Sequence, residues 1–202
     1  MAYDFNGTNQ FLSSPSAPAA DVPVTMACFF NSDSITVNQI LMAIWDGGST
    51  NRFLLEASGA IAGDPVRART GNANASSATA YSANTWHHAA GVFTSSTNRR
   101  AFIDGVGGTA NTGTQAVTGL NDLRIGNPTH VNGRIAEAAI WNTDLTDAEI
   151  ASLATGIRPS LVRPQNLVFY APLVRDLVDY ARGITLTNNN GATVDVHSRR
   201  IA

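Results

Sequence analysis

The sequence predicts an all-β fold: a two-sheet antiparallel β-sandwich of the jelly-roll type, with one short α-helix near residues 146–155. Short apolar runs recur about every 8–12 residues, and Gly, Asn and Asp separate them, as is typical of sandwiches and jelly rolls. One segment carries both the start and the stop signals of a helix. The length of 202 residues fits a single domain of this class.

The first half of the chain predicts a series of strands. Residues 3–5 and 10–12 flank Asn6-Gly7, and we expect a hairpin there because Asn and Gly tolerate positive φ. Residues 72–83 are polar and lack a clear period, so they predict no strand. The other strands expected in this half are residues 24–31, 39–45, 52–56, 66–70, 86–93 and 100–103, with a turn at Asp104-Gly105 after the last of them.

The second half continues the strand pattern and adds the helix. Thr146 is a good N-cap, and Glu149 three residues later completes a capping box. Leu145 and Ile150 can form the hydrophobic staple, and Gly156 supplies the C-terminal stop. Further strands are expected at residues 123–126, 134–141, 167–173 and 184–187, followed by a tight turn at residues 188–191.

Charge and composition exclude several classes of function. The net charge is −2, so no strong field exists to gather nucleic acid. All thirteen basic residues are Arg, and the absence of Lys excludes phosphate loops of the Gly-x-x-x-x-Gly-Lys type. The lone cysteine, Cys28, lies in an apolar run and is expected to be a small core residue.

The sequence predicts neither a membrane segment nor a secretory leader. No apolar run approaches the ~20 residues of a membrane span. The N-terminus lacks the basic stretch and apolar core of a signal peptide. We therefore expect a protein that folds in a cytoplasm and has no membrane partner.

Three stretches of the chain resemble the laminin-G-like branch of the concanavalin-A-like lectin and glucanase superfamily. They are YDFNG at residues 3–7, NTWHHAAGVF at 84–93 followed by AFIDG at 101–105, and GRIAEAAIWN at 133–142 leading into LTDAEI at 145–150. The resemblance implies two antiparallel sheets packed face to face. Within these stretches, Trp86 and Trp141 are expected to be core anchors.

Residues 157–202 depart from the usual order of that family. Residues 167–173 resemble a segment that normally precedes the first strand, but here they follow the helix. We therefore divide the chain into a jelly-roll domain, residues 1–156, and a C-terminal extension, residues 157–202. The extension is expected either to pack two or more strands on the same sandwich or to form an arm that binds a partner.

The layout after the helix also resembles small single-domain proteins encoded by bacteriophages. This resemblance implies a non-catalytic structural protein of a virion, such as a capsid decoration or tail-associated protein. It would be assembled in the host cytoplasm, and its partners would be other virion proteins or copies of itself.

The alternative is a carbohydrate-binding module that recognises a cell-surface or polymeric glycan. A sugar site needs an aromatic platform beside polar or charged side chains, whereas a large aromatic at a strand end is more often a packing residue. The candidate ligand-binding residues are Trp45, Asp46, Asn51 and Arg52, with His130 and Asn132 as a lesser cluster.

Catalysis is not expected from the sequence. The resemblance implies that an enzyme of this fold would carry its acids as Glu-x-Asp-x-Glu on one strand, and Glu56, Glu137 and Glu149 lie in no such motif. A glycosidase needs two carboxyl groups flanking the scissile bond. The adjacent His87 and His88 point to opposite faces of a strand, so they cannot both grip one metal ion in the ordinary way.

The resemblance also implies calcium as a candidate ligand, because members of that family often bind it through Asp and backbone carbonyls. Asp46, Asp64 and Asp122 lie in predicted loops and are the candidate ligands. The competing interpretation makes them turn-forming carboxylates, since Asp is a common turn residue. No other metal or cofactor is expected.

Overall fold

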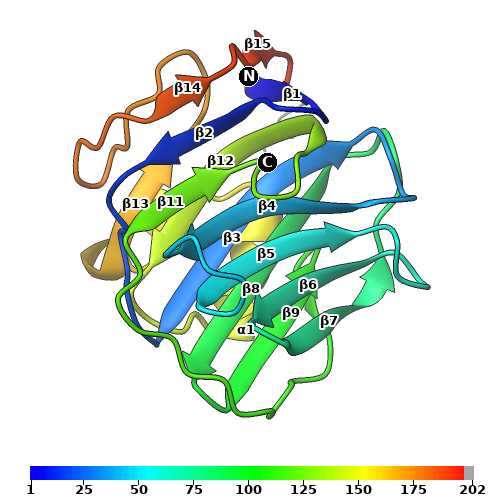
Figure 1. Ribbon diagram of the computed structural model, residues 1–202, viewed down its shortest axis with the longest axis vertical. Helices are drawn as coiled ribbons and strands as arrows, with labels where there is room; N and C mark the ends of the chain where they lie inside the picture. Colours follow the sequence, from blue (N-terminus) through cyan, green and yellow to red (C-terminus); the bar gives the residue numbers. More distant parts are fainter. Residues whose placement is uncertain (198–202) are drawn as a thin grey trace.

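A computed structural model, which describes residues 1–197, has two antiparallel sheets packed face to face (Figure 1). The sandwich predicted from the sequence is confirmed. Sheet A has the order β10-β9-β8-β3-β12-β1-β15, and β13 also pairs with β12. Sheet B has the order β14-β2-β11-β4-β5-β6-β7.

The strands of sheet A are β1 (Ala2–Asn6), β3 (Val24–Ser32), β8 (His87–Ser95), β9 (Asn98–Ile103), β10 (Val106–Gly107), β12 (Asn132–Trp141), β13 (Leu167–Ala171) and β15 (Thr193–Asp195). Those of sheet B are β2 (Phe11–Ser14), β4 (Asn38–Trp45), β5 (Arg52–Ser58), β6 (Pro65–Thr70), β7 (Ala73–Ala80), β11 (Asp122–Ile125) and β14 (Thr187–Asn189).

The main core fills the space between the two sheets. Alternate residues of each strand point inward, as the two-residue period of a strand requires. In β3 these are Met26, Cys28 and Phe30, and in β5 they include Phe53 and Leu55. Cys28 is buried as predicted, and burial raises the pKa of its thiol.

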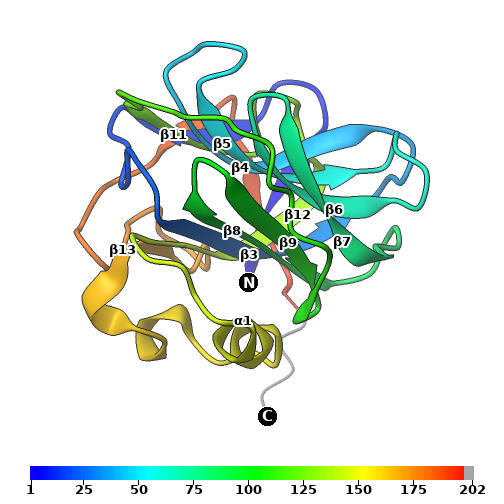
Figure 2. The ribbon, with the colours of Figure 1, turned by 90° about the horizontal axis from the view of Figure 1, so that it is seen from below.

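The predicted helix is confirmed as α1 (Asp147–Ala154), and it packs on the outer face of sheet A (Figure 2). Thr146 accepts the backbone N–H of Glu149, and the Glu149 carboxylate accepts the N–H of Thr146, which completes the capping box. Ile150 and Leu153 join a second apolar cluster with outward-facing residues of sheet A. The helix therefore covers part of the outer face of sheet A. The outer face of sheet B lies on the other side of the sandwich.

Trp141 anchors this second cluster. Its side chain is 0% exposed, and its Nε1 donates a hydrogen bond of 2.8 Å to the carbonyl of Val162. Val162 follows the short 3₁₀ turn η1 (Pro159–Leu161), which precedes a second one, η2 (Pro164–Asn166). The core role predicted for Trp141 is confirmed, although the cluster lies outside the sandwich interior.

The hairpin predicted around Asn6-Gly7 is wrong. β1 lies in sheet A, where it pairs with β12 and β15, whereas β2 lies in sheet B, where it pairs with β11 and β14. The Asn6 side chain accepts backbone N–H groups of Thr8, Asn9 and Gln10, so it closes a wider loop than a two-residue turn. This loop carries the chain from one sheet to the other.

Other strands also differ from the sequence prediction. β7 lies within the segment that predicted no strand, and its Ala and Ser side chains form an edge of sheet B. A strand is expected at residues 184–187, but the observed strand, β14, starts at Thr187 and ends at Asn189. The tight turn therefore falls at Asn190-Gly191, where both residues have positive φ.

Strands from the C-terminal segment pair with both sheets. β13 extends sheet A beside β12, β15 pairs with β1 in the same sheet, and β14 pairs with β2 in sheet B. These contacts bring residues near position 190 beside the first strands of the chain (Figure 1).

None of the helices within residues 1–197 has the length and apolar character needed to cross a bilayer.

Candidate functional site

The outer face of sheet B carries a concentration of arginine and aromatic side chains. Residues that alternate with core residues of β2, β11, β4, β5 and β6 point outward from this sheet. We call this surface the arginine face and define it by Phe11, Trp45, Arg52, Glu56, Arg67, Arg69, Asp122 and Arg124. α1 lies on the opposite side of the sandwich, so it does not cover this face (Figure 2).

Arg124 lies between the two aromatic rings of the arginine face. Its guanidinium carbon is 4.5 Å from the ring centroid of Trp45 and 5.3 Å from that of Phe11. The Nε of Arg124 donates to Asp122 Oδ2 at 2.9 Å, and Trp45 Nε1 donates to the same oxygen at 3.1 Å. These bonds orient Trp45, whose ring is partly exposed rather than core as one interpretation of the sequence expected.

Glu56 lies opposite Arg67 on the arginine face and is 0% exposed. Its carboxylate accepts hydrogen bonds of 2.5 Å from Arg69 Nη1 and from Ser58 Oγ. Arg67 is 3.7 Å away. The carboxylate therefore pairs with two arginine side chains.

Arg52 is the cross-strand partner of Trp45 and lies beside this cluster. Its Nε is buried and has no hydrogen-bond partner, and its side chain makes no ion pair with any residue that the structure describes. Burial lowers the pKa of the Arg52 guanidinium, and the nearby charge of Arg69 lowers it further, against the opposing effect of Glu56. Arg52 is thus a cation without a compensating partner of its own.

The structure separates the first predicted cluster into two parts. Trp45 and Arg52 lie on the arginine face, whereas Asp46 and Asn51 stabilise the loop between β4 and β5. Asn51 Nδ2 donates to Asp46 Oδ2 at 2.6 Å, and Asp46 Oδ1 accepts the N–H of Gly48 at 2.7 Å. The hydrogen bond from Asn51 is the main reason that the pKa of Asp46 is lowered.

The second predicted cluster is also divided. The His130 ring lies 6.2 Å from that of Phe11, and its Nε2 is 3.0 Å from Asn127 Nδ2; Asn127 in turn accepts a hydrogen bond from Arg124. His130 therefore borders the arginine face. Asn132 begins β12 in sheet A, where its N–H donates to Gln39 Oε1, which is a structural role.

The three calcium candidates do not form a metal site. Asp122 is bound by Trp45 and Arg124, and the backbone carbonyl of Asp64 accepts the N–H of Tyr81. In the described part of the chain, no group of three or more His, Cys, Asp or Glu side chains could hold a metal ion.

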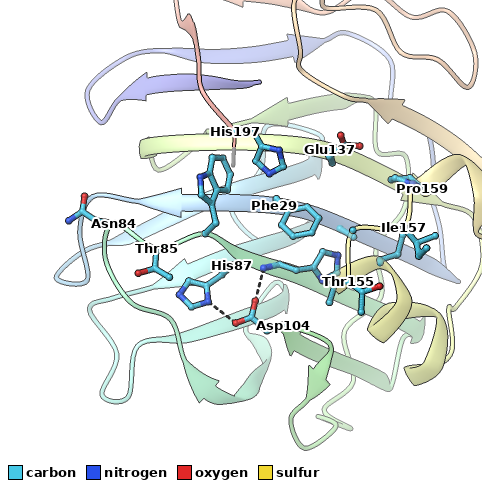
Figure 3. A pocket seen from close by; sticks show the side chains of 16 residues that line it. Phe29, Asn84, Thr85, His87, Asp104, Glu137, Thr155, Ile157, Pro159 and His197 are labelled. Atoms are coloured by element: carbon cyan, nitrogen blue, oxygen red, sulfur yellow. Dashed lines mark hydrogen bonds and ion pairs between the residues drawn. The ribbon is translucent and has the colours of Figure 1, made fainter. Parts of the chain in front are cut away.

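A cavity of about 1070 Å³ lies on the opposite side of the molecule, between the outer face of sheet A and the end of α1 (Figure 3). Phe29, Trp86 and His197 contribute rings to its wall. The core role predicted for Trp86 is wrong, because this side chain is only partly buried and lines the cavity. No local pattern indicates this role, since the cavity needs α1 to fold over the sheet.

Asp104 joins the two adjacent histidines at the cavity floor (Figure 3). Its Oδ1 accepts the backbone N–H of His88 at 2.8 Å, and its Oδ2 lies 2.7 Å from His87 Nδ1. Because His87 Nε2 accepts the N–H of Ser82, the ring proton of His87 lies on Nδ1 and is donated to Asp104. Burial alone would raise the pKa of Asp104, but these hydrogen bonds lower it overall.

His88 lies on the other face of β8 from His87 and packs against Phe29, with ring centroids 5.1 Å apart. It is 3% exposed, and its Nδ1 has no hydrogen-bond partner among residues 1–197. Burial lowers the pKa of His88 to about 4, so its ring is neutral at neutral pH.

Two acids that are distant in sequence, Asp104 and Glu137, also line the cavity. Glu137 lies at the bulge of β12 with a φ of +53°, and its carboxylate accepts a hydrogen bond from Tyr170. Asp104 is engaged by the histidines. The other glutamates lie elsewhere, since Glu56 is buried on sheet B and Glu149 caps α1.

The two packed antiparallel sheets define the class of lectin-like jelly rolls. A family model described as the concanavalin A-like lectin/glucanases superfamily matches residues 6–151, and the chain belongs to that superfamily. A comparison with curated proteins finds no match. The similarity to small bacteriophage proteins stays a prediction.

Solved structures share the fold at low sequence identity. A Bacteroides ovatus protein has a TM-score of 0.70 and 17% identity, over 96% of this chain and 60% of the other, so the chain spans less than two thirds of that relative. Domain 4 of AbnA, a GH43 extracellular arabinanase from Geobacillus stearothermophilus in complex with arabinotriose, has a TM-score of 0.63 and 16% identity, over 76% of each chain. The CBM40 of Ruminococcus gnavus IT-sialidase bound to α2,3-sialyllactose has a TM-score of 0.61 and 13% identity, over 76% of this chain and 95% of the other.

Proposed function

We propose that this protein is a non-catalytic carbohydrate-binding domain that binds a glycan on the arginine face. The observation that carries the proposal is the stack of Trp45, Arg124 and Phe11 on a sheet surface that α1 leaves uncovered. Sugar rings pack their apolar faces on aromatic side chains while their hydroxyl groups bond to polar and charged neighbours. The arginine face supplies both kinds of group within adjacent strands.

The comparisons support this choice of ligand class. Two of the solved structures that share the fold are described with an oligosaccharide bound, arabinotriose in one and sialyllactose in the other. The proposed site itself rests on the geometry of this chain.

The cavity beneath α1 is the competing location. Most of its polar groups are already engaged: Asp104 by the two histidines, while Glu137 and His197 also have partners. The arginine face instead offers a cation without a partner beside an oriented aromatic ring. This contrast favours the face for ligand binding.

The arginine face holds no carboxylate that is free to catalyse a reaction on a bound sugar. On the arginine face Glu56 is enclosed by arginines and Asp122 is held by Trp45 and Arg124. Neither carboxylate is placed to act as a proton donor or nucleophile toward a sugar lying on the surface. A glycan-binding role needs no such group.

A glycan array followed by titration calorimetry tests the function. Trp45→Ala is expected to weaken binding of any array ligand about tenfold or more, because the aromatic platform is lost. Trp86→Ala is the matched control, since it removes a partly buried tryptophan on the opposite side. Binding that survives Trp45→Ala but disappears with Trp86→Ala would move the site to the cavity, and an array without any bound glycan would refute the proposal.

Placement in a virion, with other virion proteins or copies of the chain as partners, remains a separate proposal from the sequence. Co-purification with particles and measurement of the oligomeric state test it independently of glycan binding.

A further inference from the structure

The arginine face carries more positive than negative charge. Its four guanidinium groups, those of Arg52, Arg67, Arg69 and Arg124, face two carboxylates, those of Glu56 and Asp122. The protein as a whole has a net charge of −2, so this surface is opposite in sign to the average of the molecule. An anionic ligand would therefore be favoured here over most of the rest of the surface.

The excess charge is concentrated near Arg52. Glu56 is already committed to Arg69 and Arg67, and Asp122 to Arg124. Arg52 has neither a carboxylate partner nor a hydrogen bond at its buried Nε among the described residues. A carboxylate already compensates the charge of each of the other arginines on this face, so an added anion gains more at the Arg52 guanidinium than at a paired arginine.

The position of Arg52 also relates it to the aromatic platform. Arg52 and Trp45 are directly opposite each other on β5 and β4, and such pairs have Cβ atoms roughly 5 Å apart. A sugar ring packed on Trp45 would therefore place its substituents within reach of the guanidinium. Arginine matches a planar carboxylate with two parallel N–H groups.

We infer that the arginine face selects a carboxylated sugar, such as a uronic or sialic acid residue, with Arg52 as the group that binds the carboxylate. This inference rests on the proposed function, because it names the class of glycan that the same face binds. Arg52 would give the site a preference for carboxylated over neutral sugars, which an aromatic platform alone would not have.

Matched pairs of probes test the charge requirement. Titration calorimetry would compare 3′-sialyllactose with lactose, and trigalacturonate with its methyl ester, and each pair differs in the carboxylate. The carboxylated member of at least one pair is expected to bind about tenfold tighter or more, since hydrogen bonds to charged groups exceed neutral ones. Raising the salt concentration should weaken that binding and leave the neutral partner's unchanged.

Two single substitutions test whether Arg52 causes the preference for the carboxylated probe. Arg52→Gln is expected to lower the affinity for the carboxylated probe to that of the neutral probe. Arg182→Gln, which changes an exposed arginine outside the arginine face, should leave it unchanged. Thermal unfolding of both variants confirms that they are folded at the temperature of the titration.

The outcomes separate this inference from the proposed function. If neutral and carboxylated probes bind equally and Trp45→Ala abolishes both, glycan binding stands and the carboxylate inference is wrong. The inference is likewise overturned if a sulfated sugar binds and neither carboxylated probe does. If no glycan binds at all, the proposed function fails, and the inference fails with it.

Discussion

Arg124 and Trp45 donate hydrogen bonds to the same oxygen of Asp122, and the guanidinium carbon of Arg124 lies 4.5 Å from the Trp45 ring centroid. The three side chains come from neighbouring strands, β11 and β4, whose register places Asp122 opposite Trp45. The ring is thus held by both an edge contact and a face contact. A preorganised platform loses less conformational entropy on binding than a mobile one.

Arg124→Ala should therefore weaken glycan binding by about tenfold, because Trp45 loses the cation that holds its face. The free energy of unfolding should fall by only about 1 kcal/mol, since the ion pair with Asp122 is partly exposed. Calorimetry and Trp fluorescence measure the two effects. Arg100→Ala is the matched control, because Arg100 stacks on Phe102 in sheet A in a similar way and pairs with Asp147; equal loss of binding in both variants would contradict the assignment.

Glu56→Gln should destabilise the fold by about 2–3 kcal/mol. The substitution leaves Arg67 and Arg69 close together on the sheet without their buried carboxylate, and breaking a buried ion pair is strongly unfavourable. The partial exposure of both arginines reduces the effect. Denaturant unfolding measures it.

A double-mutant cycle identifies the cause of that loss. Replacing Arg69 with Met in the Glu56→Gln background should recover part of the stability, since it removes one of the uncompensated cations. Strictly additive effects of the two substitutions would mean that their ion pair does not contribute.

The class of fold and the helix could be predicted because their signals are local. The apolar run Phe53-Leu54-Leu55 between Arg52 and Glu56 is visible in the sequence, and so is the capping box of α1. The arginine face depends instead on which strands become neighbours. Trp45 and Arg52 flank one turn, so the sequence could place them together, but nothing local says that Arg124 reaches the same ring, because sheet register is set by packing across the whole sandwich.

The same reason explains the errors around residue 7 and Trp86. Asn-Gly is a strong hairpin signal, but here the Asn6 side chain closes a longer loop between two sheets. Trp86 has the sequence context of a core residue, yet the cavity it lines exists because α1 returns to sheet A some sixty residues later in the chain. Both outcomes depend on contacts between distant segments.

Replacing Trp141 and replacing Trp86 with Ala should lower the free energy of unfolding by different amounts. Trp141→Ala should cost about 3–5 kcal/mol, because it empties a fully buried site and leaves the Val162 carbonyl without its donor. Trp86→Ala should cost less than about 2 kcal/mol, since the side chain is partly exposed. Chemical denaturation of the two variants measures the difference, and similar losses would show that Trp86 is a core residue after all.

The buried His88 should make the protein less stable in mild acid. The unfolded chain binds a proton at His88 near pH 6.5, whereas the folded chain does so only near pH 4. The unfolded state therefore binds more protons between these values, and the free energy of unfolding falls as the pH drops from about 6.5 to about 4. The full effect is at most about 3 kcal/mol and does not increase below that window.

His88→Gln isolates this contribution, because glutamine keeps a polar side chain and does not titrate. The variant should lose much of the pH dependence of the unfolding midpoint between pH 6.5 and 4, measured by thermal unfolding in a series of buffers. Asp104 does not confuse the result, since its lowered pKa places the titration of the folded carboxyl below this window. If wild type and variant lose stability in parallel between pH 6.5 and 4, the pKa of His88 does not differ between the folded and unfolded states as its burial requires.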